Sequence, residues 1–75
     1  MKLKDFSILT KENVFLRVVA VGYGLVFAGY IKSKMPDEFY DMDILAIKST
    51  KSRSHVLGYE CEVSFIDWLL VSDKL

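Results

Sequence analysis

A chain of 75 residues has room for one small domain and not for two. Its ten basic and ten acidic residues cancel, whereas nucleic-acid-binding proteins usually carry a basic excess. The only cysteine, Cys61, excludes an internal disulfide framework, and the only histidine, His55, leaves too few ligands for structural zinc. We therefore predict one α+β domain over residues 1–75, without a metal or cofactor, in a reducing cytoplasm.

The N-terminal segment predicts a short helix. Leu3, Phe6 and Leu9 recur at a spacing of three residues, which gives such a helix one apolar side. The opening residues contain no apolar core of the kind found in a signal peptide, which agrees with the cytoplasmic assignment.

An apolar stretch follows and predicts a hairpin. Val14 to Val21 and Leu25 to Ile31 are expected to form two antiparallel strands, joined by a turn at Gly22-Tyr23-Gly24 that can take the positive φ angles of a tight connection. The run is too short to cross a membrane as a helix. Both strands are apolar on both faces, so we expect each face of the sheet to be covered.

The second half of the chain predicts a helical turn and a second hairpin. Residues 36–41 combine a proline with acidic residues, which suits the first turn of a helix. Asp43 to Lys48 is expected to form a third strand and Thr50 to Ser54 a polar loop. Tyr59 to Phe65 alternates apolar and polar residues and is expected to form a fourth strand.

The C-terminal tail allows two interpretations. Residues 66–75 could extend the fourth strand, or they could form a short helix capped by Ser64, with Asp67 three residues later. The predicted architecture is thus a four-stranded antiparallel sheet of two hairpins, with a short N-terminal helix on one face. The second face is covered by the tail, by another subunit, or by both.

The residue types offer several candidate sites, and most favour a structural interpretation. Cys61 falls on the apolar face of a strand, where a thiol is normally inert, and no third group orients His55 as its base. The acidic run from Asp37 to Asp43 lacks the spacing of a calcium loop. The loop from Lys48 to His55 is basic, but little aromatic surface accompanies it for stacking on nucleic-acid bases. We therefore predict no catalytic residues.

The predicted partner-binding residues lie in the tail and in the basic loop. Trp68, Leu69 and Leu70 either cover the open sheet face or anchor a partner, since tryptophan is enriched at the centres of interfaces. Lys51 and Arg53 could meet an acidic patch on a protein or a phosphate backbone. The expected partner is a protein or a second copy of the chain; nucleic acid and membrane are not expected.

The order of elements resembles that of small proteins encoded by phages and mobile elements of Gram-positive bacteria. The resemblance rests on the opening Met1-Lys2-Leu3-Lys4-Asp5-Phe6, on Phe27-Ala28-Gly29-Tyr30, and on the segment from Met35 to Leu45. It implies an accessory role, such as inhibition of a host defence complex of the CRISPR effector type. The basic loop and the Trp68-Leu69-Leu70 tail depart from that pattern.

Three hypotheses for the function follow. The first is a non-enzymatic binding module that occupies a protein surface, as a phage-borne inhibitor of a host complex would. The second is a structural homo-oligomer. The third is a weak nucleic-acid binder acting through the loop from Lys48 to His55.

Overall fold

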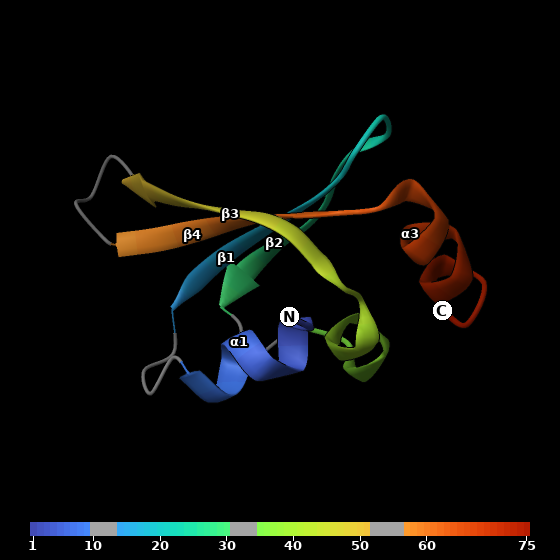
Figure 1. Cartoon of the computed structure of the whole chain (residues 1–75), viewed down its shortest axis with the longest axis horizontal. Coiled ribbons are helices and arrows are strands. Elements are labelled where there is room, and N and C mark those ends of the chain that lie inside the picture. The colour runs from blue at the N-terminus through green and yellow to red at the C-terminus, as the bar shows by residue number, and fades with distance from the viewer. Residues whose placement is uncertain (10–13, 31–34, 52–56) are drawn as a thin grey trace.

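The chain folds as a four-stranded sheet with helices below one face and at one end (Figure 1). This computed structural model describes residues 1–9, 14–30, 35–51 and 57–75. The α+β class, the N-terminal helix and the short helical turn are confirmed. In chain order the elements are α1 (Leu3–Leu9), β1 (Phe15–Ala20), β2 (Gly24–Tyr30), the 3-10 helix η1 (Asp37–Asp41), β3 (Ile44–Lys51), β4 (Leu57–Val63) and α3 (Phe65–Ser72).

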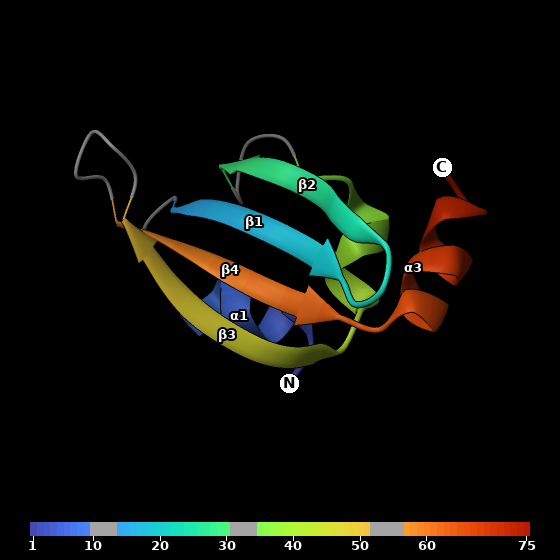
Figure 2. The same cartoon turned by 90° about the horizontal axis from the view of Figure 1, so that it is seen from above.

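The sheet is mixed, which corrects the predicted all-antiparallel sheet. Its strand order is β2-β1-β4-β3, and both hairpins are antiparallel as expected. The central strands β1 and β4, however, run parallel (Figure 2). In their register Val18 lies opposite Cys61. Parallel strands need a crossover connection, and here the chain passes through η1 below the sheet before β3 begins. Local sequence patterns define each hairpin but not how two hairpins join.

Two strand boundaries also differ from the prediction. β3 continues to Lys51, so Thr50 belongs to a strand and not to the predicted loop, because pairing with β4 extends the ladder this far. β4 ends at Val63, and Phe65 begins α3 instead of ending the fourth strand.

The first hairpin closes through glycine, as predicted. Gly22 has φ 82° and Gly24 has φ 132°, conformations that side-chain-bearing residues rarely adopt. The N–H of Tyr23 donates to the carbonyl of Ala20 at 3.0 Å and closes the turn. A bulge follows, because Val18 pairs with Phe27 while Val19 pairs with Leu25, and this leaves Val26 without a partner in β1.

The core lies between the lower face of the sheet and the helices. Alternate residues of β1 and β4 point into it, and Leu16, Val18, Ala20, Cys61 and Val63 are fully buried. α1 and η1 cover this face, since the side chains they direct toward it are also buried. The buried residues are Leu3, Phe6, Leu16, Val18, Ala20, Met35, Phe39, Met42, Cys61, Val63 and Val71.

Backbone hydrogen bonds join the N-terminus to the start of β3. The N–H of Leu3 donates to the carbonyl of Met42 at 3.0 Å, and the N–H of Ile44 donates to the carbonyl of Met1 at 2.8 Å. The N–H of Lys2 donates to Asp5 Oδ2 at 3.0 Å, which caps the first turn of α1. α1 is therefore held at its N-terminal end against the segment that follows η1.

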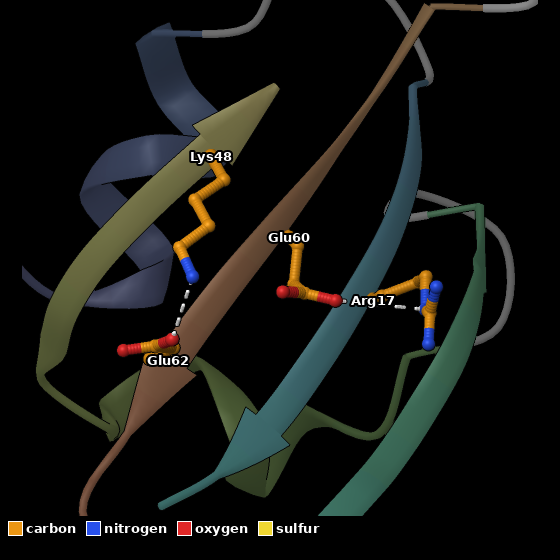
Figure 3. Close-up of polar contacts among 4 residues, drawn as sticks. All are labelled: Arg17, Lys48, Glu60 and Glu62. Atoms are coloured by element: carbon orange, nitrogen blue, oxygen red, sulfur yellow. Dashed lines mark ion pairs between the residues drawn. The ribbon is translucent and has the colours of Figure 1, made fainter. Parts of the chain in front are cut away.

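The upper face of the sheet is not covered by any described element of this chain (Figure 1). Two cross-strand ion pairs lie on it, Arg17 Nε to Glu60 Oε1 at 3.8 Å and Lys48 Nζ to Glu62 Oε1 at 3.2 Å (Figure 3). The expectation that the tail covers this face is wrong, because α3 packs beside η1 at the end of the sheet. Cover by another subunit stays a prediction.

Replacing Leu3 by alanine tests how strongly α1 depends on the core. Leu3 has no exposed surface, so Leu3→Ala should lower the free energy of unfolding by about 2–5 kcal/mol. Ile8 lies on the same helix with 76% of its surface exposed, and Ile8→Ala should change it by only about 0.5 kcal/mol or less. Urea unfolding of both variants measures the difference; similar losses would contradict this packing.

Candidate functional site

The C-terminal helix α3 begins at a capped residue. Ser64 is extended, with φ −72° and ψ 150°, and its Oγ accepts a hydrogen bond from the N–H of Asp67 at 3.0 Å. This satisfies one of the unpaired amides of the first turn, where the Asp67 carboxylate also suits the positive end of the helix dipole. The helical interpretation of the tail is therefore confirmed, with the cap predicted for it.

One side of α3 packs against the rest of the molecule. Val71 is buried, and the partly buried Trp68 lies edge-to-face with Phe39 of η1 at a ring distance of 5.7 Å. The ring of Trp68 also lies 6.0 Å from that of Tyr23 in the hairpin turn, which stacks in turn on Phe65 at 5.9 Å. Trp68 thus contacts both η1 and the turn of the first hairpin.

The other side of α3 is apolar and exposed. Ile66, Leu69 and Leu70 expose 70%, 49% and 62% of their surfaces, and their spacing of three and four residues places them on one side of the helix. Phe65 is partly exposed beside them. We call these four residues the α3 apolar face. α3 is thus buried on one side, while most of its remaining surface is apolar and exposed.

A pocket of about 120 Å³ lies between η1 and α3. Three acidic residues, three apolar residues and one lysine line it: Glu38, Asp41, Asp67, Met42, Leu70, Val71 and Lys74. Asp67 Oδ2 accepts from the N–H of Asp43 at 3.2 Å, a bond that ties α3 to the segment before β3. Leu70 belongs both to this pocket and to the α3 apolar face.

The structure separates the predicted partner-binding residues. Leu69 and Leu70 lie on the exposed face of α3, whereas Trp68 is directed toward the core. Lys51 ends β3 at the opposite end of the sheet from α3 (Figure 1), and its side chain is outside the described residues, as is the whole of Arg53. Lys51 therefore does not belong to the same site as Leu69 and Leu70.

The sequence did not point to Phe65 and Ile66 as parts of the α3 apolar face, nor to Tyr23 as a residue in contact with α3. Ile66, Leu69 and Leu70 have helical spacing, and this pattern could have identified them once the tail was taken as a helix. The position of Tyr23 against Phe65 carries no such signal, because the two residues are distant in sequence.

The residues considered for chemistry are placed as follows. Cys61 is fully buried in the core, and burial raises the pKa of its thiol to about 11, with a further contribution from the negative charge of Glu60. His55 lies outside the described residues. Of the basic loop, Lys48 is described and pairs with Glu62. No group of three metal-ligating side chains occurs among the residues in the described ranges.

No protein-family model, curated protein or solved structure matches this chain. Within the described segments, α1 and α3 are both too short to cross a membrane. The candidate site therefore rests on the geometry of α3.

Removing the Ser64 hydroxyl tests what holds α3 in place. Ser64→Ala should lower the free energy of unfolding by about 0.5–2 kcal/mol, because the amide of Asp67 loses its acceptor. Ser64→Gly should cost only a few tenths of a kcal/mol, on the order of the usual difference for a glycine cap. Urea unfolding followed by circular dichroism compares the two; equal losses would show that the cap contributes nothing.

Proposed function

We propose that this chain is a non-enzymatic protein-binding module that docks through the α3 apolar face. The observation that carries the proposal is the exposure of Ile66, Leu69 and Leu70 on a helix whose opposite side is anchored. Large aliphatic side chains clustered on a rigid element are typical of protein interaction sites. The burial and raised pKa of Cys61 argue against its use as a nucleophile.

Burial of this surface by a partner would contribute favourably to binding. Full burial of an exposed leucine or isoleucine contributes about 1.5–3 kcal/mol, and a few such residues commonly dominate an interface. The anchoring of α3 by Trp68 and the Ser64 cap fixes the backbone in advance, which reduces the entropy lost on binding.

The proposal extends to the biological role suggested by the sequence. A small protein that acts by occupying a surface needs a rigid apolar patch and no catalytic group. The resemblance to phage and mobile-element accessory proteins supports inhibition of a host complex, such as a CRISPR effector, as that role. The α3 apolar face lies in the tail that departs from the resembled pattern, where an individual function is expected.

A matched pair of substitutions tests the docking surface. Ile66→Asp places a charge on the α3 apolar face, and should weaken capture of a protein partner from an extract of the host cells by about tenfold or more. Ile8→Asp makes the same change at a similarly exposed position on α1, and capture should be unchanged. Quantitative affinity purification compares both with the original chain. Undiminished capture by Ile66→Asp would remove the proposal.

A second candidate is a homodimer formed by the same face. The α3 apolar face carries no charge on its three aliphatic residues, so two copies could pack against each other about a two-fold axis. In that case light scattering should give twice the chain mass, and Leu69→Lys should return it to that of one chain. A mass that Leu69→Lys leaves unchanged would exclude this dimer.

A further inference from the structure

We infer that the partner segment that docks on α3 presents a lysine or arginine side chain to the pocket between η1 and α3. This inference rests on the proposed function and specifies the chemistry of the partner. Leu70 lines the pocket and also belongs to the α3 apolar face, so the two are parts of one continuous surface. A segment that covers Ile66, Leu69 and Leu70 would therefore pass beside the pocket.

The charges of the pocket favour a cationic group. Glu38, Asp41 and Asp67 contribute three carboxylates, against the single ammonium group of Lys74. Within the described part of the chain, the ion pairs found join other residues on the upper face of the sheet, and none joins these four. A cation from a partner would therefore gain Coulomb attraction without breaking an existing ion pair.

α3 lines the pocket along most of its length. Asp67 contributes from the first turn, Leu70 and Val71 contribute from the second, and Lys74 contributes from just beyond the helix. The last turn of α3 contains no basic residue of its own, so Lys74 supplies the single positive charge of this lining.

The apolar part of the lining suits the stem of a long basic side chain. Met42 and Val71 are both buried, and Leu70 extends this apolar surface to the exterior. Lysine and arginine commonly place their methylene groups on apolar surface while the charged end reaches polar groups. The expected partner segment is thus amphipathic: aliphatic residues meet the α3 apolar face, and a basic residue enters the pocket.

Nuclear magnetic resonance titration of the full chain with small probes tests the chemistry of the pocket. Nα-acetyl-arginine amide and Nα-acetyl-lysine amide are the cationic probes, and Nα-acetyl-norleucine amide is the uncharged control. At least one cationic probe should cause saturable shifts, at millimolar concentration, in the backbone amides of Asp41, Leu70, Val71 and Lys74. These shifts should weaken with added salt. Absence of saturation, or equal shifts with norleucine amide, would overturn the inference.

Variants of the carboxylates separate the pocket from general charge attraction. Glu38→Gln and Asp41→Asn should each weaken binding of the cationic probe by about two- to fivefold, in the range of an exposed ion pair. Asp73 lies at the end of α3 but does not line the pocket, so Asp73→Asn should leave binding unchanged. Equal weakening by Asp73→Asn would show attraction without a site, and would overturn the inference.

The same variants distinguish the two proposals in the capture experiment. If Ile66→Asp abolishes capture but Glu38→Gln and Asp41→Asn leave it unchanged, the α3 apolar face binds a partner and the cation inference alone fails. If Ile66→Asp leaves capture unchanged, the proposed docking surface fails, and the pocket no longer has a partner segment to bind. Weakening by Ile66→Asp and by both pocket variants supports both proposals.

Discussion

Burial of one face of the central strands is the constraint on which the rest of this structure depends. Leu16, Val18 and Ala20 of β1 have no exposed surface, and Cys61 and Val63 of β4 lie in the same layer. In so small a domain, these residues can be kept from water only if α1 and η1 both cover the same face. The backbone bonds that tie residues 1–3 to residues 42–44 keep these two covering elements together.

The position of α3 follows from this arrangement. Because α1 and η1 already cover the lower face, α3 packs at the end of the sheet, where Trp68 and Val71 complete the core beside η1. Only one side of a helix can be buried at such an edge. The remaining apolar residues of α3 are therefore exposed, next to an acidic pocket.

The upper face of the sheet is more polar than β1 and β2 by themselves indicate. β1 and β2 are apolar on both faces, which predicts burial on both. β4, however, places Glu60 and Glu62 on the upper face, where they pair with Arg17 and Lys48 of the neighbouring strands. The charged side chains of β3 and β4 make this face polar, although the sequence of β1 alone indicates an apolar one. The alternation of apolar and polar residues in β4 predicted one charged face for that strand. Its charges lie beside β1 only after the two strands have paired.

The sequence by itself determined the local elements of this protein. The spacing of Leu3 and Phe6, the glycines of the first turn and the Ser64 cap act over a few residues, and the helices and hairpin they specify are all present. Only the tertiary structure decided that β1 and β4 run parallel, that Trp68 faces inward while Leu69 and Leu70 face outward, and that a pocket forms beside them. These features depend on which surfaces pack together after the elements have formed. The packing is selected by the burial of apolar side chains that are distant in sequence.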